Sequence, residues 1–338
     1  MPVAIGTGMQ FRELRRVLQA IVLAGLPACG LGEGVVGSLG GNGECERTVV
    51  KKFDFELPAD PPLQLRVESC RVDADACLDL CAMLMTRAGL QAPSSCAVTF
   101  QFGDTVHATA SYTESTNNPS CGVEGRRPAG LVHPKRIDAH DAVGRWLAHA
   151  AWLEAASIPA FIYLARELDM HGAPRGLARA ALAAARDEIR HAKIMRQVAM
   201  RYGATVPSVD VALPAERSLE ELAIENAIEG CVRETWGAVV ALWQAHRADD
   251  PELRAIYRGI ADDEARHAAL GWAIDQWVRT RLDAAAHARI DAAHEAAVRE
   301  IFEGEHAEVL AVLGLPIGSE ERGLLSRTYD TLWTRRAA

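Results

Sequence analysis

The sequence predicts a mainly α-helical protein, with a bundle of helices over residues 141–313 and a small disulfide-rich α+β domain before it. Three observations support this prediction. After position 140 the apolar residues recur with the helical period of about 3.6, in a segment dominated by Ala, Leu, Arg and Glu. Six of the eight cysteines lie between positions 45 and 121. The 338 residues are also enough for two or three domains.

The periodic segment divides into five expected helices, at 141–171, 175–202, 218–247, 251–280 and 283–313. Turn and cap residues stand at the breaks between them: His171-Gly172, Pro174, Ser218 with Glu221, and Asp250-Pro251. The first four helices would form a four-helix bundle, and the fifth would pack beside it. Pro159 removes one backbone hydrogen bond and is expected to kink the first helix. Residues 314–338 are expected to form a C-terminal tail.

The N-terminal residues have the pattern of an export signal at 1–28. Arg12, Arg15 and Arg16 form a basic start, and the apolar run 17–26 is too short to span a bilayer. Together with Leu26-Pro27-Ala28-Cys29, this pattern resembles a bacterial lipoprotein signal. The resemblance implies an exported protein in the periplasm or cell envelope, attached to a membrane only through a lipid on Cys29. The alternative is a buried N-terminal helix.

The next segment combines a Gly-rich tether at 29–44 with a cysteine-rich domain at 45–125. A helix is expected at 75–88 and a hairpin of two strands at 98–102 and 105–113, joined at Gly103-Asp104. An even set of cysteines in an exported chain predicts three disulfides, of unknown pairing, among Cys45, Cys70, Cys77, Cys81, Cys96 and Cys121. A zinc module is the alternative. Residues 126–140 form a linker.

The charge balance excludes one class of partner. The net charge is −9 and the pI is about 5.7. Because a phosphate-binding face needs clustered Lys and Arg, nucleic acid is not expected to bind.

Two copies of a Glu-x-x-His motif carry the strongest chemical signal. The stretch 186–192 recurs at 262–268, so that Glu188 with His191 matches Glu264 with His267. A three-residue step on a helix places both side chains on one face. Both motifs lie in the apolar stripes of the second and fourth expected helices. A carboxylate or imidazole in that position is costly unless it is paired or binds a metal.

The other two helices each offer a carboxylate at a matching position. Glu154 lies in the core stripe of the first helix, 34 residues before Glu188, and Glu229 lies in that of the third, 35 residues before Glu264. Glu225 and Glu234 are further candidates. Glu225 lies one turn from Glu229 on roughly the same face, whereas Glu234 is rotated by about 140° from Glu229 and is expected to support a ligand or form an ion pair. The sequence therefore predicts six metal ligands: Glu154, Glu188, His191, Glu229, Glu264 and His267.

These residues resemble the ferritin-like di-iron and di-manganese proteins, in which two helices each give a Glu and two others each give a Glu-x-x-His. The stretch 154–161, the two Asp-Glu-x-Arg-His motifs and 229–235 are similar to exported bacterial ferritin-like domain proteins. The resemblance implies two iron ions, with manganese or a mixed Mn/Fe pair as alternatives. The oxygen-rich ligand set also favours iron over zinc.

The residues before the motifs predict the partners of the histidines. A metal-binding His usually donates its other ring N–H to a carboxylate. Asp187 and Asp263 each precede a ligand Glu, so we expect Asp187 to accept from His267 and Asp263 from His191. The alternative is that both pair with Arg190 or Arg266.

Three functions are compatible with such a site. The first is a di-iron oxidase or oxygenase that uses O₂ on a small-molecule substrate. The second is a protein that oxidises or holds iron without an organic substrate. The third is an interaction module in which the metal only stabilises the bundle.

Overall fold

The computed structural model of the chain describes residues 11–26, 46–57, 76, 79, 80, 83, 97–102, 106–117, 125–134, 136–212, 216–303 and 308–334. The chain forms two compact units. The smaller comprises Cys45–Asn118, and the larger comprises Met1–Glu44 together with Pro119–Ala338.

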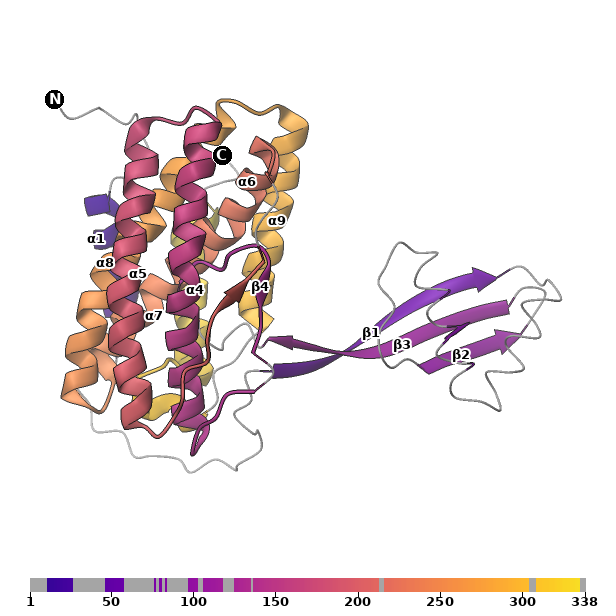
Figure 1. Cartoon of the computed structure of the whole chain (residues 1–338), viewed down its shortest axis with the longest axis horizontal. Coiled ribbons are helices and arrows are strands. Elements are labelled where there is room, and N and C mark those ends of the chain that lie inside the picture. Colours follow the sequence, from indigo (N-terminus) through magenta and orange to yellow (C-terminus); the bar gives the residue numbers. More distant parts are fainter. Residues whose placement is uncertain are drawn as a thin grey trace. The chain divides into compact units, whose positions relative to one another are not determined.

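The described strands of the smaller unit form a three-stranded antiparallel sheet in the order β1-β3-β2 (Figure 1). Its strands are β1 (Glu46–Leu57), β2 (Ala97–Phe102) and β3 (Val106–Asn117). Phe102 pairs with Val106, so the predicted hairpin between β2 and β3 is confirmed. Four residues of the expected helix at 75–88, namely Ala76, Asp79, Leu80 and Met83, are helical. The six cysteines lie outside the described residues, and their disulfides remain a prediction.

The larger unit is built mainly from long helices, which Figure 1 shows side by side. They are α4 (Ala142–Met170), α5 (Arg175–Arg201), α6 (Leu219–Glu225), η1 (Asn226–Arg233), α7 (Glu234–Arg247), α8 (Pro251–Arg279) and α9 (Ala284–Glu303). Consecutive helices α4 and α5 pack together, as do α7 and α8, and α5 packs on α8. The capping box of Ser218 and Glu221 is present, and Pro251 begins α8 as expected.

The third expected helix is not a regular α-helix over its whole length. Between α6 and α7, η1 is a π-helix, in which the amide of Glu234 donates to the carbonyl of Glu229. Such a wide turn holds one more residue than an α-helical turn. The prediction of one uninterrupted α-helix at 218–247 is therefore wrong at this point, and the difference bears directly on the site.

The expected tail and the end of the fifth helix also differ from the prediction. After α9, the chain forms the 3₁₀ segment η2 (Glu308–Leu313), α10 (Gly318–Thr328) and the π-turn η3 (Tyr329–Trp333). Leu324, Leu325 and Leu332 are buried. The described part of the tail is thus a helical element packed through its apolar residues.

The N-terminal helix α1 (Phe11–Leu23) packs against α7, α8 and α10. Its residues Leu14 and Leu18 are buried, and Arg15 lies 2.7 Å from Asp262. The guanidinium of Arg327 donates to the carbonyl of Ile21 at 3.1 Å. This arrangement agrees with the alternative of a buried N-terminal helix. Export and lipidation of Cys29, which lies outside the described residues, remain predictions.

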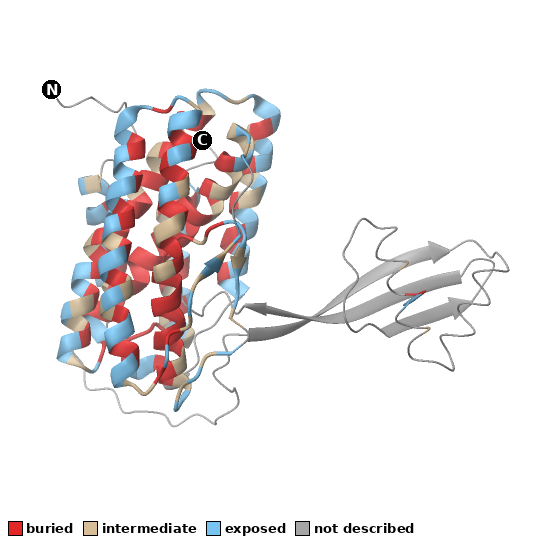
Figure 2. Ribbon diagram, viewed as in Figure 1, coloured by how far each residue is buried: buried red, intermediate tan, exposed pale blue. Residues whose placement is uncertain are grey.

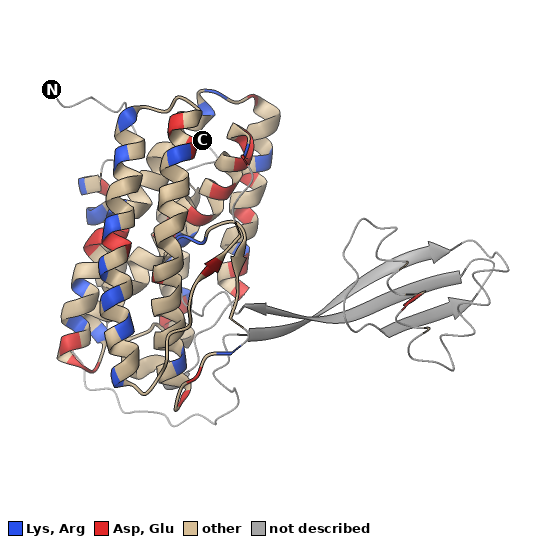
Figure 3. Ribbon diagram, in the orientation of Figure 1, with Lys and Arg blue, Asp and Glu red and all other residues tan. Residues whose placement is uncertain are grey.

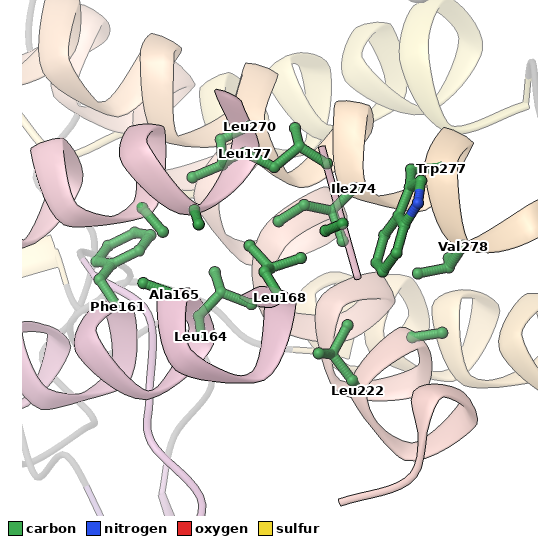
Figure 4. Packing of buried hydrophobic residues seen from close by; sticks show 14 of the residues in the cluster. Phe161, Leu164, Ala165, Leu168, Leu177, Leu222, Leu270, Ile274, Trp277 and Val278 are labelled. Carbon is green, nitrogen blue, oxygen red and sulfur yellow. The ribbon is translucent and has the colours of Figure 1, made fainter. Parts of the chain in front are cut away.

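One large apolar cluster of the core lies between α4, α5, α6 and α8. Figure 4 shows its large side chains, contributed mainly by α4 and α8. Figure 2 shows buried positions facing inward along these helices, and Figure 3 shows charged residues of both signs over their outer faces.

By length and composition alone α4 could cross a membrane, but 72% of its most apolar window is buried within the protein, as in any core helix. A small sheet of β4 (Leu131–Val132) and β5 (Asp210–Val211) lies outside this core.

Candidate metal centre

Six buried carboxylate and imidazole side chains converge inside the larger unit. Glu154 comes from α4, Glu188 and His191 from α5, Glu234 from the start of α7, and Glu264 and His267 from α8. Their ligand atoms fall into two groups, each with all atoms within 4.8 Å of one another: Glu154, Glu188, His191 and Glu264, and Glu234, Glu264 and His267. Glu264 belongs to both groups, so the two lie next to each other.

Short distances connect the six side chains. His267 Nδ1 lies 3.0 Å from Glu188 Oε1, which brings a residue of the first group beside the second. His191 Nδ1 lies 3.3 Å from Glu264 Oε1 and 3.4 Å from Glu154 Oε2. The two imidazole rings are 6.2 Å apart between centroids. Both rings therefore direct Nδ1 toward the carboxylates.

Ten buried polar atoms of this cluster make no hydrogen bond of acceptable geometry, although several of them lie close to one another. Both carboxylate oxygens of Glu154, Glu188, Glu234 and Glu264, and Nδ1 of both histidines, are in this state. Burying a polar or charged group without a partner is costly. These ten buried ligand atoms could hold a metal ion, and their chemistry fits one.

A network of Asp and Arg residues orients the two imidazoles from outside. His191 Nε2 lies 2.9 Å from Asp263 Oδ2, and His267 Nε2 lies 3.4 Å from Asp187 Oδ2. Each aspartate therefore faces the histidine of the other motif, as the duplication suggests. A carboxylate that accepts from Nε2 leaves Nδ1 free to bind a metal.

The arginines of the two motifs join the same aspartates. Arg190 donates to Asp187 and to Asp263 at 2.7 Å each, and Arg266 contacts both as well. The expected Asp–His pairs and the alternative Asp–Arg pairs are thus present together. Each aspartate bridges a buried imidazole and an arginine that is about half exposed.

The charges in the cluster perturb the pKa of its members in opposite directions. Burial lowers the pKa of His191, but the negative charge of Glu154 and the bond to Asp263 outweigh it and raise this pKa well above its usual range. Burial raises the pKa of Glu264, but the positive charge of His267 outweighs it and lowers this pKa. For Glu188, burial and the charge of Glu154 together raise the pKa. The raised pKa of Glu188 favours its protonated form, and a bound cation would favour loss of that proton.

The structure does not bring Glu229 into this cluster, and Glu234 occupies the expected place. Glu229 instead accepts from the backbone N–H of Arg127 at 3.1 Å and lies 3.3 Å from Arg233 Nε. Glu225 pairs with Arg126. The physical reason is the π-helix. In a regular α-helix, Glu234 would be rotated by about 140° from Glu229 around the helix axis. The extra residue of the wide turn reduces this rotation by about 100°, so Glu234 lies on nearly the same face as Glu229, one turn further along.

One signal in the sequence could have pointed to Glu234. Glu234 stands 13 residues before Arg247, the end of α7, and Glu264 stands 13 residues after Pro251, the start of α8. Two helices joined by a short turn place such positions at the same height. Glu229 stands 18 residues before Arg247, about one turn too far from the turn.

Comparison of the chain with protein-family models, curated proteins and solved structures found no match. The geometry of the site therefore carries the functional argument by itself.

Proposed function

We propose that the larger unit is a ferritin-like four-helix bundle that binds two iron ions and uses them to oxidise a small-molecule substrate with O₂. The observation that carries this proposal is the set of six buried side chains with inward-facing, unpartnered ligand atoms. Four Glu and two His from four helices are the ligand set of di-metal carboxylate bundles.

Charge balance favours two ions over one. Four carboxylates carry four negative charges, which two divalent cations neutralise. A single divalent ion would leave two negative charges buried among groups that are at most 2% exposed. Glu264, which belongs to both groups, would contribute carboxylate oxygens to each metal position.

The ligand chemistry favours iron or manganese over zinc. The set has eight carboxylate oxygens, two imidazoles and no thiolate, and oxygen-rich sets with few imidazoles suit hard or borderline metals. Two iron ions would supply one-electron redox steps and a place for O₂ to bind.

The surrounding residues suit such chemistry. Asp263 and Asp187 hold the two imidazoles in one orientation. The ring of Phe161 is buried and lies 5.0 Å from that of His267, so it gives this imidazole an apolar neighbour. Glu188 and Glu234, whose pKa values are raised, are suited to hold or release protons as the charge of the site changes.

The test is to load the full chain with ferrous iron without oxygen, count the iron bound, and then measure O₂ consumption. We expect two iron ions per chain and O₂ consumption in the wild-type protein. Glu264→Gln should bind neither ion tightly, because this residue serves both groups. Glu252→Gln, an exposed glutamate at the start of α8, is the matched control and should bind two.

Other outcomes would select the remaining functions. Iron oxidation that continues far beyond two ions per chain would favour an iron-handling protein. Tightly held metal that never reacts with O₂ would favour a structural metal in an interaction module. Failure of the wild-type chain to bind metal would contradict all three.

We also propose that the protein is exported and lipid-anchored at Cys29, on the resemblance of its N-terminal residues to a lipoprotein signal. Mass spectrometry of the protein from its native host decides this. A mature chain that begins at a lipid-modified Cys29 is the expected result, whereas retention of α1 would contradict it. The same measurement, without reductant, tests the proposed three disulfides.

A further inference from the structure

We propose that Arg126 is a positioning residue for one of the two metal positions, the one formed by Glu234, Glu264 and His267. This inference rests on the proposed function. Arg126 holds the π-helix η1 in the register that turns Glu234 into the cluster.

Arg126 binds the chain at the point where the α-helix changes to the π-helix. Its Nε and Nη2 donate to Glu225 at 3.0 and 2.5 Å, and its Nη1 donates to Asn226 Oδ1 at 3.3 Å. Glu225 is the last residue of α6 and Asn226 is the first of η1. The side chain of Arg126 is 2% exposed. A guanidinium buried to this extent needs its carboxylate, so the pair fixes the start of the π-helix.

The same contacts continue to the helix that carries His267. Asn226 Nδ2 donates to the carbonyl of Gly271 at 2.9 Å, four residues after His267 on α8. A Cβ atom built on Gly230 would lie 3.0 Å from Gly271 Cα and 3.1 Å from Arg126 Nη1. The guanidinium, the π-helix and α8 are therefore packed without spare room.

The ring of Phe161 lies between the guanidinium of Arg126 and the imidazole of His267. Its guanidinium carbon lies 6.0 Å from the centre of the Phe161 ring, which in turn lies 5.0 Å from the His267 ring. The next residue, Arg127, binds Glu229 through its backbone N–H. Arg126 and Arg127 thus bind Glu225 and Glu229, the first and last residues of the segment 225–229. Glu234 follows this segment in the chain.

Arg126 contacts the residues that precede Glu234 and, on its other side, the Phe161 ring that lies beside His267. Among the described residues, the hydrogen bonds of Arg126 go to Glu225 and Asn226 and none goes to Glu154, Glu188 or His191. Loss of Arg126 should therefore weaken one metal position and spare the other, whereas a general loss of stability would weaken both.

The experiment is a Co²⁺ titration of the metal-free full chain, followed by absorbance and by metal analysis. The wild-type chain should bind two Co²⁺ ions. Arg126→Gln should bind the first with wild-type affinity and the second at least tenfold more weakly. Glu225→Gln removes the same ion pair from its more exposed partner and should do the same, which keeps the test valid if Arg126→Gln folds poorly.

The matched control is Arg279→Gln. Arg279 is a partly buried arginine that binds Asp275 and Asp291 away from η1, so its loss should leave both Co²⁺ affinities unchanged. Wild-type affinity for both ions in Arg126→Gln and Glu225→Gln, or equal weakening of both ions, would overturn the positioning role alone. A wild-type chain that binds fewer than two ions would contradict the proposed function, and this inference with it.

Discussion

The two halves of the helical unit bring equivalent carboxylates into the buried cluster through different backbones. In the first half, Glu154 lies within α4, which is continuous through Pro159. In the second half, Glu234 follows the π-helix η1, which is held by Arg126 and by the contact of Gly230 with Gly271. The Glu-x-x-His helices α5 and α8 are regular in both halves. The difference shows that a carboxylate can reach the same centre either by helical spacing alone or by a wide turn that must be stabilised by its neighbours.

The largest expected effect distinguishes the two glutamates of the second half. Glu234→Gln should reduce the iron bound from two ions per chain to one, because Glu234 belongs to only one of the two groups. Glu229→Gln is the comparison and should keep both ions, since Glu229 belongs to neither group and the Gln amide oxygen can still accept from the backbone N–H of Arg127. Metal analysis after gel filtration measures this. The reverse result would mean that the third helix has a different register in solution.

The next effect concerns the close packing of the wide turn against α8. A Cβ atom on Gly271 would lie 2.4 Å from the carbonyl oxygen of Gly230, so Gly271→Ala forces backbone atoms apart. We expect a loss of about 2–3 kcal/mol in the free energy of unfolding, as for overpacked cores.

Gly259 provides the comparison on the same helix. A Cβ atom there meets nothing within 4 Å, so Gly259→Ala should stabilise α8 by about 0.5–1 kcal/mol. Urea denaturation of both variants measures the two effects. Equal effects of the two substitutions would show that η1 does not pack on α8 as described.

A smaller effect compares the two aspartates that orient the imidazoles. Asp263→Ala should weaken metal binding by roughly ten- to a hundredfold while leaving the fold intact. Asp187→Ala should have a smaller effect, because Asp187 lies 3.4 Å from His267 whereas Asp263 lies 2.9 Å from His191. Competitive titration with a chelator measures both affinities. Unchanged affinity in Asp263→Ala would mean that the arginines alone hold the network together.

The sequence predicts the first half of this site better than the second, for a physical reason. The positions of Glu154, Glu188, His191, Glu264 and His267 follow from helical period and spacing, because α4, α5 and α8 are regular. Glu229 was selected by extending the same period through a segment in which the backbone adds a residue. A π-helix depends on partners distant in the sequence, here Arg126 and Gly271, so a period within one helix cannot reveal it.

The other differences between the predicted and the observed fold also arise from contacts between residues distant in the sequence. The breaks at Ser218 and Asp250 were predicted because capping is local. The packing of α1 was only the alternative to an export signal, and that of α10 was not predicted, since burial of Leu14 or Leu324 depends on surfaces that other helices supply. In the smaller unit the hairpin of β2 and β3 was predicted from its turn, whereas the pairing of β1 with β3 joins strands about 60 residues apart.

The last comparison concerns the pKa values of two buried imidazoles in unlike surroundings. His191 faces carboxylates and its pKa is raised, whereas burial lowers the pKa of His149 to about 4, with smaller contributions from His133 and Arg127. The pKa of His149 in the folded chain is below the ordinary value of about 6.5, so between pH 6.5 and 4 the unfolded chain binds more protons there. The contribution of neutral His149 to stability is therefore complete above about pH 6.5. It falls by about 1.4 kcal/mol for each pH unit below that.

His149→Phe keeps an aromatic ring to stack on Trp152 and removes the group that titrates. Urea denaturation of both proteins at several values between pH 7.5 and 5 should show the wild-type chain losing stability relative to the variant only below pH 6.5. A difference that stays constant over this range would contradict the lowered pKa of His149.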